Sequence, residues 1–518
     1  MSNRISTKNA AGGTGLSSKG LKGGQVGLIG AVVIGISCIA PAYTLTSGLG
    51  PTVSEVGVQL PAIFLVGFIP MILVALGYRE LNNAMPDSGT SFTWATRAFG
   101  PWVGWMGGWG LIAATIIVLS NLAAVAVDFF YLMLAQVTGN DSLADLTLNL
   151  PLNIATTLVF VAIACWISYR GVETTKTVQY VLVAFQLIVL TWFSVAAFAH
   201  VAGGTAFDAT QISWDWFNPF AVESFSAFAA GVSLSIFVYW GWDVTLTMNE
   251  ETRDPDKTPG RAATATVFVI VLIYMMIALA VISFAGVGDG ELGAGNPDNQ
   301  ESIFAILATP VMGPFAILMS LSILSSSAAS LQSTFVSPAR TLLAMGHYRA
   351  LPKRFGRISP SYKSPGYATV AAAIAASAFY VVTRLLSENA LWDTITALGL
   401  MICFYYGITA LACVWYFRRD AFESIRSFLL KFLAPAVGGV ILFVMFIKTA
   451  FDSMDPDYGS GSSVGGVGLV FVLGMGVIVL GAVLMLVMYR INPGFFRGET
   501  LRTGHSRSAA EEENPAVL

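Results

Sequence analysis

The amino-acid sequence predicts an all-α integral membrane protein, and three observations lead to this fold class. Of the 518 residues, 55% are hydrophobic and only 11% are charged, whereas soluble domains carry about 25% charged residues. The apolar residues form continuous runs, and a helix needs about 20 such residues to cross a bilayer. Continuous runs differ from the short alternating segments of a transmembrane β-barrel. So much apolar surface excludes a soluble enzyme, a nucleic-acid-binding protein and a secreted scaffold.

Twelve apolar runs follow one another and are predicted as transmembrane helices. They cover residues 26–47, 59–81, 101–131, 152–169, 177–201, 225–249, 262–286, 303–336, 366–386, 391–417, 428–450 and 465–489. The first run is longer than the core of a signal peptide, which has about 7–15 residues. We therefore expect a first span rather than a cleaved signal. We expect no attached soluble catalytic domain, because every hydrophilic segment is of loop length.

The positions of Lys and Arg predict the orientation of these spans. With the N-terminus in the cytoplasm, 25 of the 27 basic residues fall in the two ends or in cytoplasmic loops, and only Arg384 and Lys448 fall outside. The loops of the other parity carry mainly acids, such as Asp141 and Asp289. Cytoplasmic loops of membrane proteins are enriched in basic residues. We therefore expect a multi-pass protein of the cytoplasmic membrane with both termini in the cytoplasm.

Two of the predicted spans are interrupted near their middle. In the first span, Pro41 lies among the small residues Ser37, Ala40 and Ala42. A proline has no N–H, and its ring clashes with the carbonyl four residues back. In the sixth span, Gly241 stands among three aromatic residues, where glycine lowers helix propensity by about 1 kcal/mol. Both positions are predicted breaks in the helix.

Asp243 is the clearest ionisable residue deep within any span, and Asp128, near an outer helix end, is the other candidate. A carboxylate inside the membrane is costly and is expected to face a cavity or a partner. An alternative interpretation stays open at each place. Pro41 could be a kink packed against neighbouring helices, and Asp243 could only hold helices together.

Spans 1 and 6 are five apart, so each opens a five-helix half. An odd number of spans inserts the second half in the opposite orientation. Interrupted helices at matching positions of two inverted halves indicate a substrate site near the midplane. The N-terminal end of a half-helix suits a carboxylate, and freed carbonyls suit an ammonium group. A site with both features favours a zwitterionic substrate.

Three motifs lie in order at the expected spans. The first is Phe237–Asp243 followed by Asn249–Pro259, the second is Ser337–Pro352, and the third is Ser91–Pro101 running into Trp105–Trp109. They resemble the sixth helix with its acidic exit, the end of helix 8, and the entry to helix 3 in permeases of the amino acid–polyamine–organocation (APC) superfamily, amino acid permease type. The resemblance covers most of residues 25–450. It implies a LeuT-like fold of twelve helices, with a 5+5 inverted repeat, broken helices 1 and 6, and two C-terminal helices.

This resemblance implies the following division of the chain. The segments are a cytoplasmic N-terminal tail (1–25), a first five-helix repeat (26–201), an extracellular loop (202–224), a second five-helix repeat (225–417), helices 11 and 12 (418–489) and a cytoplasmic C-terminal tail (490–518).

The resemblance also implies a substrate site. Backbone amides at the first break would hold the substrate carboxylate, at Ala40, Pro41, Ala42 and Tyr43. This Ala-Pro-Ala run has one amide fewer than the Gly-Ser-Gly type run of many relatives. Carbonyls of the sixth span would meet the amine, at Phe237, Val238, Tyr239 and Trp240.

Further site residues follow from the same resemblance. Phe237 stands where relatives carry a gating aromatic residue, and Asp243 stands where they have a carboxylate that helps to gate the outer side. Ile112 and Thr115 would line the pocket for the substrate side chain.

Ion coupling has several open alternatives. Some proton-coupled relatives carry a lysine in helix 5 where this chain has Gln186, and glutamine cannot titrate. The hydroxyl run Ser325, Ser326 and Ser327 could ligate Na⁺ together with carbonyls of the first span, or it could only pack between helices. Proton coupling through Asp243, Na⁺ coupling and exchange all stay open.

We therefore expect a secondary active transporter that moves an amino acid across the cytoplasmic membrane by alternating access. A permease for polyamines or small amines such as ethanolamine, an amino acid exchanger, and a transporter-derived sensor are the alternatives. An enzyme is not expected, because no polar catalytic constellation stands within the spans. The expected partners are a small-molecule substrate, H⁺ or Na⁺, and the lipid bilayer. We expect no cofactor, no metal centre and no nucleic acid.

Overall fold

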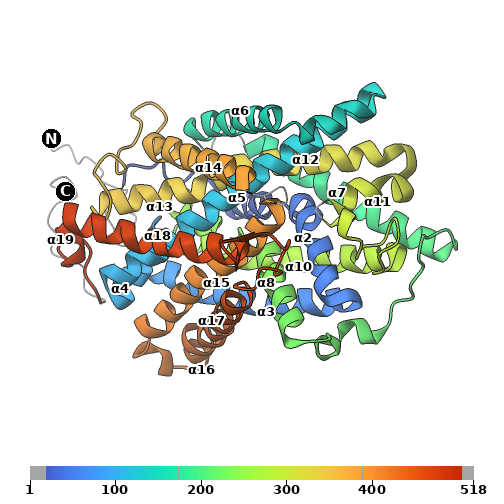
Figure 1. Cartoon of the computed structure of the whole chain (residues 1–518). Helices are drawn as coiled ribbons and strands as arrows, with labels where there is room; N and C mark the ends of the chain where they lie inside the picture. The colour runs from blue at the N-terminus through green and yellow to red at the C-terminus, as the bar shows by residue number, and fades with distance from the viewer. Residues whose placement is uncertain (1–18, 172–175, 301, 387–389, 505–518) are drawn as a thin grey trace, which may run out of the picture.

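The computed structural model describes residues 19–171, 176–300, 302–386 and 390–504. The chain is mainly helical within these ranges (Figure 1). The α-helices of the first half are α1 (Leu28–Ile39), α2 (Pro41–Val56), α3 (Leu60–Ala84), α4 (Ser91–Phe99), α5 (Pro101–Thr138), α6 (Leu150–Tyr169), α7 (Lys176–Ala202), α8 (Phe225–Val238), α9 (Val244–Thr247) and α10 (Thr258–Ala285). Those of the second half are α11 (Ile303–Met312), α12 (Ala316–Thr334), α13 (Val336–His347), α14 (Gly366–Leu386), α15 (Ala390–Tyr416), α16 (Ile425–Ser427), α17 (Ala434–Asp452), α18 (Leu469–Ile491) and α19 (Pro493–Phe496).

Shorter elements connect these helices. One antiparallel hairpin pairs β1 (Ser463–Val464) with β2 (Val467–Gly468). A π-helix, η10 (Phe428–Leu433), leads into α17. The 3₁₀ helices are η1 (Gly57–Gln59), η2 (Asp141–Leu148), η4 (Trp214–Phe217), η5 (Pro219–Ala221), η6 (Asn249–Glu251), η7 (Pro297–Asn299), η8 (Gly313–Phe315) and η9 (Asp420–Phe422).

The predicted fold class is confirmed. Ten helical segments of the described residues are long and apolar enough to cross a membrane. The segment Leu28–Ala84 has 57 residues, and a straight helix of that length would be about 85 Å long at 1.5 Å per residue. It is instead divided into α1, α2, η1 and α3. The segment Phe225–Val238 is shorter than a full span, so the count of twelve spans stays a prediction.

Two predicted boundaries need correction. The run 303–336 was predicted as one span, but it is divided into α11 and α12 at Gly313, where the backbone φ of 56° ends the first helix. Its last residues continue into α13 as far as His347. The helix α4 was not predicted, because its nine residues are too few and too polar to form an apolar run.

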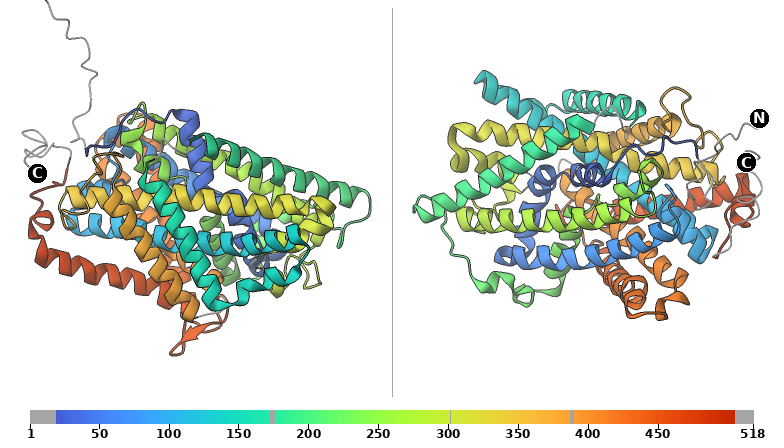
Figure 2. Two further views of the ribbon diagram at one scale, coloured as in Figure 1. Left: turned by 90° about the horizontal axis from the view of Figure 1, so that it is seen from above. Right: turned by 180° about the vertical axis from the view of Figure 1, so that it is seen from behind.

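The long helices lie side by side in one bundle, as the two views of Figure 2 show. At its centre α5 packs against eight other α-helices: α4, α6, α12, α13, α14, α15, α18 and α19. The interrupted pair α2 and α8 pack against each other, and α10 packs against both α1 and α3. Buried apolar side chains from almost every helix form one continuous cluster. The interrupted helices are therefore held inside the bundle.

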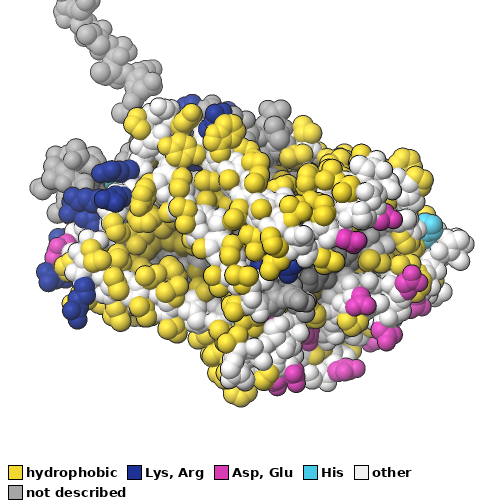
Figure 3. Space-filling model, turned by 45° about the horizontal axis from the view of Figure 1, so that its top comes forward, with side chains coloured by type: hydrophobic (Ala, Val, Ile, Leu, Met, Phe, Trp, Pro, Cys, Tyr) yellow, Lys and Arg dark blue, Asp and Glu magenta, His cyan; other side chains and the backbone are white. Residues whose placement is uncertain are grey.

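Charged side chains are separated along the bundle. In Figure 3, Lys and Arg gather mainly at the left end, Asp and Glu lie mainly toward the right, and a broad hydrophobic face separates them. The left end carries α4, α13 and α19 in Figure 1, and we call it the basic end. This separation follows the predicted alternation of loop charge. Because basic loops face the cytoplasm in membrane proteins, a cytoplasmic basic end stays our prediction.

Candidate functional site

The first helix is broken at Ala40. Helix α1 ends at Ile39, Ala40 adopts the left-handed conformation with φ 55° and ψ 67°, and α2 begins at Pro41. The Ala40 N–H still closes α1 by donating to the Ile36 carbonyl at 2.9 Å. A residue other than glycine pays about 1–2 kcal/mol for this conformation. The strain therefore lies at the predicted break.

The start of α2 presents backbone donors inside the bundle. Pro41 has no N–H, and no side chain caps the helix. The first N–H groups of a helix have no partner within the helix and carry its positive dipole end. Ala42 and Tyr43 stand at this position, and both are buried. Their amides are suited to an anionic group.

The second break lies at the end of α8. The helix ends at Val238, the Trp240 N–H donates to the Phe237 carbonyl at 2.9 Å, and Gly241 follows with φ 114°. An L side chain rarely adopts this conformation, so glycine is required here. The four-residue helix α9 begins at Val244. The last turn of α8, whose carbonyls have no partner within a continuing helix, therefore lies at the break.

The two breaks are in direct contact. A Cβ atom added to Gly241 would lie 3.1 Å from the carbonyl carbon of Cys38 and from the amide nitrogen of Ile39. A Cβ atom added to Gly48, about two turns into α2, would lie 2.7 Å from Cγ1 of Val238. Glycine thus permits close approach at both places. We call this contact, formed by residues 38–43 and 237–241, the crossing.

A tyrosine from α10 joins the two broken helices. The Tyr274 O–H donates to the Val238 carbonyl at 2.8 Å, and its oxygen lies 2.6 Å from the Thr44 hydroxyl oxygen. Val238 therefore already has one backbone partner. Nearby, the rings of Tyr43 and Phe237 meet edge to face at 6.5 Å. The sequence analysis missed Tyr274, although a tyrosine in the middle of an apolar run was a usable signal.

Asp243 is reached through a short chain of hydrogen bonds. The indole N–H of Trp240 donates to the Tyr405 hydroxyl at 2.5 Å, and that hydroxyl donates to Oδ2 of Asp243 at 3.0 Å. Asp243 is 2% exposed, so its carboxylate does have a partner. It follows the break, in the stretch of chain that leads through α9 toward the basic end. The role in the outer gate that the resemblance implies for Asp243 stays a prediction.

The pocket residues expected on α5 are both buried. Ile112 and Thr115 are at most 3% exposed, and Thr115 donates to Leu111 of its own helix at 2.6 Å. Gly110 precedes Ile112 by two residues in α5. It lies so close to α15 that an added Cβ atom would be 2.7 Å from Cβ of Tyr405. Gly110 thus places α5 against Tyr405, the partner of Trp240, and the pocket role of Ile112 and Thr115 stays a prediction.

The serine run on α12 divides into separate contacts. Ser326 donates to the side-chain oxygen of Gln186 at 2.5 Å, so these two predicted residues meet each other. Ser325 donates to Ser322 of its own helix at 3.0 Å. Ser327 is fully buried, and its hydroxyl has no partner among the described residues. None of these hydrogen bonds reaches α1.

Other hydroxyl residues of α12 contact α1. Ser330 donates to the Cys38 carbonyl at 2.9 Å, and the Thr334 hydroxyl lies 3.1 Å from the Cys38 sulfur. Ser333 lies 3.4 Å from Ser37. Ser330 lies four positions after Ser326, and Ser333 and Thr334 lie three and four positions after Ser330. Residues three or four positions apart lie on the same face of a helix. That spacing was the signal that the sequence analysis missed.

The basic end is closed by buried ion pairs. Lys19 lies 2.8 Å from Asp87 and 2.6 Å from Glu250, and Asp87 also accepts from Tyr348 at 2.8 Å. Farther along, two nitrogens of Arg340 donate to the two carboxylate oxygens of Glu251, each at 2.9 Å. These contacts join the N-terminal segment, the loop before α4, η6 and α13. Buried ion pairs therefore hold these segments together at the basic end.

Ion pairing sets the charge of the Lys19–Asp87 pair. Burial by itself would lower the pKa of Lys19, but Asp87 and Glu250 raise it well above its ordinary value. Burial would raise the pKa of Asp87, but Lys19, with hydrogen bonds from Thr93 and Gly89, lowers it to about 2. Both groups are therefore charged throughout the neutral pH range.

Two broken helices that meet inside an apolar helical bundle define a membrane transporter with the LeuT-like fold. Residues 26–472 match the family model described as "Amino acid permease". The chain therefore belongs to the amino acid permease family of the APC superfamily. This family and this fold are those of transporters rather than enzymes.

Proteins similar to the chain include a bacterial transporter and a transporter of known structure. A methylthioribose transporter of Bacillus subtilis (strain 168) is 23% identical over 220 residues, which cover 40% of this chain and 44% of the relative. The chain thus matches less than half the length of this curated relative. The crystal structure of MhsT in complex with L-phenylalanine aligns with a TM-score of 0.54 at 15% identity, over 79% of this chain and 98% of that chain. This likeness shows the fold.

The contact between the breaks predicts the effect of Gly241→Ala. The methyl group would force an unfavourable φ and press on the Cys38–Ile39 peptide, so we expect a loss of about 1–3 kcal/mol. The melting temperature of the purified protein should fall. Gly476→Ala is the matched control, because nothing lies within 4 Å of the added Cβ atom. A Gly241→Ala protein as stable as the unmodified one would refute the close contact.

The buried ion pairs of Lys19 with Asp87 and Glu250 predict that Lys19→Met destabilises the protein. Removing one partner of a buried ion pair costs about 3–5 kcal/mol, so the melting temperature should fall. Exposed Lys353→Met is the control.

The pH dependence of this loss follows from the two pKa shifts. The lowered pKa of Asp87 makes its contribution complete above its ordinary 3.8 and lost as the pH falls through about 2. The raised pKa of Lys19 makes its contribution complete below its ordinary 10.5. We therefore expect the same loss of melting temperature at pH 5 and pH 9. A loss that changed markedly between these values would contradict the assigned charges.

Proposed function

We propose that the protein is a secondary active transporter that moves an amino acid across the cytoplasmic membrane by alternating access. The observation that carries the proposal is the crossing, where the donor end of α2 and the acceptor end of α8 meet within the bundle. Inside a membrane, backbone groups released from a helix need a partner. A zwitterion supplies an acceptor and a donor at once.

The chemistry of the crossing supports an α-amino acid. The amides of Ala42 and Tyr43, at the positive end of α2, are proposed to bind the carboxylate. Carbonyls at the end of α8, from Phe237 to Trp240, are proposed to bind the ammonium group, with Val238 also held by Tyr274. Ile112 and Thr115 of α5 are proposed to face the substrate side chain.

Transport by this site requires the bundle to open. Tyr43, Phe237 and Trp240 are at most 3% exposed, so substrate cannot enter the crossing as it stands. The ion pairs at the basic end close one side. We propose that this end opens to the cytoplasm when the contacts of Lys19 and Arg340 separate, and that Phe237 gates the crossing.

Ion coupling is proposed to use polar groups beside the crossing. Asp243, bonded to Tyr405, is one candidate and would carry a proton. The hydroxyls of α12 are the other candidate for Na⁺, including Ser325, Ser326 and Ser327 and the residues Ser330 and Thr334 that contact α1. Gln186, which accepts from Ser326, would position that helix without titrating.

A second candidate substrate class is a polyamine or a small amine such as ethanolamine. The specific observation in its favour is Pro41, which removes one backbone donor at the start of α2. An amine has no carboxylate and would not need that donor. Exchange of one amino acid for another is the remaining alternative to ion-coupled uptake.

The proposal predicts that a free α-carboxylate is needed for transport. In proteoliposomes containing the full chain, we would screen labelled amino acids, beginning with L-phenylalanine, the ligand in the MhsT structure. The amine analogue of the best substrate should compete about 100-fold more weakly, because roughly 1.5–3 kcal/mol is lost with each charge-assisted hydrogen bond. Gradients of Na⁺ or H⁺, or amino acid preloaded inside, would distinguish the modes of coupling.

Ala42→Trp serves to locate the site in this assay. Ala42 is fully buried at the start of α2, so the larger side chain should abolish uptake. Ala162→Trp, on the exposed face of α6, is the control. Equal competition by amino acid and amine would favour the amine permease. Unchanged uptake by the Ala42→Trp protein would place the site elsewhere.

A further inference from the structure

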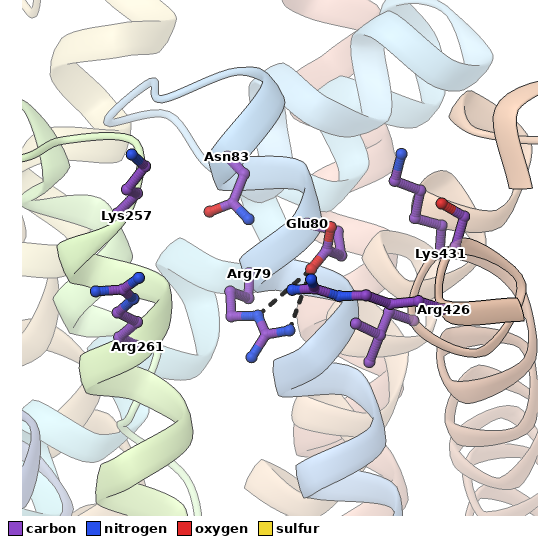
Figure 4. Close-up of a pocket in the computed structure, with 9 residues that line it drawn as sticks. Arg79, Glu80, Asn83, Lys257, Arg261, Arg426 and Lys431 are labelled. Carbon is purple, nitrogen blue, oxygen red and sulfur yellow. Dashed lines mark hydrogen bonds and ion pairs between the residues drawn. The ribbon is translucent and has the colours of Figure 1, made fainter. Parts of the chain in front are cut away.

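A polar cavity of about 610 Å³ opens away from the crossing. Figure 4 shows its lining side chains, which come from three parts of the chain: the end of α3, the start of α10, and the α16–η10 segment. Five of them are cations, namely Arg79, Lys257, Arg261, Arg426 and Lys431. The remaining lining residues are Glu80, Asn83, Ser427 and Leu430. We call this space the basic cavity.

The basic cavity has far more positive than negative charge. Its one lining carboxylate, Glu80, is bonded to Arg79 through two nitrogens at 3.4 and 3.2 Å. In Figure 4 the side chain of Arg426 points toward this pair. Lys257, Arg261 and Arg426 are exposed, and no ion pair joins them to a carboxylate of the described residues within 4 Å. The cavity is therefore suited to an anion with several oxygens, such as a phosphate.

The fold brings these cations together although like charges repel each other. Gly260 lies so close to α3 that an added Cβ atom would be 2.4 Å from Cγ of Arg79 and 3.0 Å from its Cα. The start of α10 is thereby held against the end of α3, although Arg79 and Arg261 repel each other. The positive dipole end of α10 adds to the same field. Cytoplasmic loops are basic in general, but that tendency does not by itself require convergence on one cavity.

Apolar side chains beside the cavity indicate the source of the phosphate. Along the third wall, Ile425 is 82% exposed, Phe422 is 67% exposed, and Leu429 and Leu433 are at least 40% exposed. These residues alternate with Arg426 and Lys431 along one short segment. A soluble phosphate would make no use of them, whereas the acyl chains of a phospholipid would cover them. Basic pockets between transmembrane helices bind anionic headgroups in this way.

We propose that the basic cavity binds the phosphate headgroup of an anionic phospholipid, with its acyl chains against the exposed apolar side chains of η9, α16 and η10. The headgroup phosphate accepts from Arg261 and Arg426 on opposite walls. Bound lipid therefore offsets the repulsion between α3, α10 and the segment that leads into α17. This inference does not depend on which substrate the crossing binds.

The test is a lipid titration of the detergent-solubilised full chain. Dioleoylphosphatidylglycerol and dioleoylphosphatidylcholine would be compared by native mass spectrometry. We expect preferential binding of phosphatidylglycerol, weakened about tenfold or more in the double variant Arg261→Gln/Arg426→Gln. The matched control, Arg354→Gln/Arg357→Gln, removes two exposed charges from the loop after α13 and should bind as the unmodified protein does. Equal weakening in both variants would overturn the proposal.

Two further measurements complete the test. Glu80→Gln removes the one carboxylate that lines the cavity, so it should tighten phosphatidylglycerol binding several-fold. A gain of binding cannot come from misfolding, and unchanged or weaker binding would overturn the proposal even if the double variant failed to fold. Inorganic phosphate should compete poorly with the lipid. Competition as effective as that of phosphatidylglycerol itself would show a site for soluble phosphate and would overturn the lipid assignment.

Discussion

The structure depends on one constraint, which is that backbone hydrogen-bonding groups within a membrane need partners. Two helices are interrupted in the middle of the bundle, one at Ala40 and the other at Gly241. The molecule does not leave these breaks facing lipid. It packs them against each other, and glycine at position 241 allows the backbones to approach. The crossing therefore gathers the ends of the interrupted helices at one buried place.

Side chains of neighbouring helices hold this place through hydrogen bonds. Tyr274 joins α2 to the end of α8, and Ser330 joins α12 to the Cys38 carbonyl. Tyr405 connects Trp240 to Asp243, from which the chain continues toward the ion pairs of the basic end. Residues 243–251 therefore connect the crossing to the ion pairs of the basic end along the chain.

Sequence reasoning predicted the parts of the structure that follow from composition and from single residues. Apolar runs gave the membrane helices, and Pro41 and Gly241 marked the two breaks. The division of the run 303–336 at Gly313 was missed, because an apolar helix that turns back has the same composition as one that continues. Ser330 and Thr334 were not singled out because several hydroxyl residues follow one another, and only three-dimensional packing selects the face that meets α1. The Na⁺ role of Ser325, Ser326 and Ser327 stays a prediction. Lys19 was missed as a closing residue because its partners, Asp87 and Glu250, are distant in sequence.

The central claim is that the free main chain at the crossing binds the charged groups of an amino acid. The most direct measurement is an experimental structure of the protein in a lipid nanodisc, determined with a saturating concentration of its transported substrate. The account predicts ligand density between the start of α2 and the end of α8, with a carboxylate within hydrogen-bond distance of the amides of Ala42 and Tyr43. Ligand bound elsewhere, or a first helix running unbroken through residue 40, would contradict it.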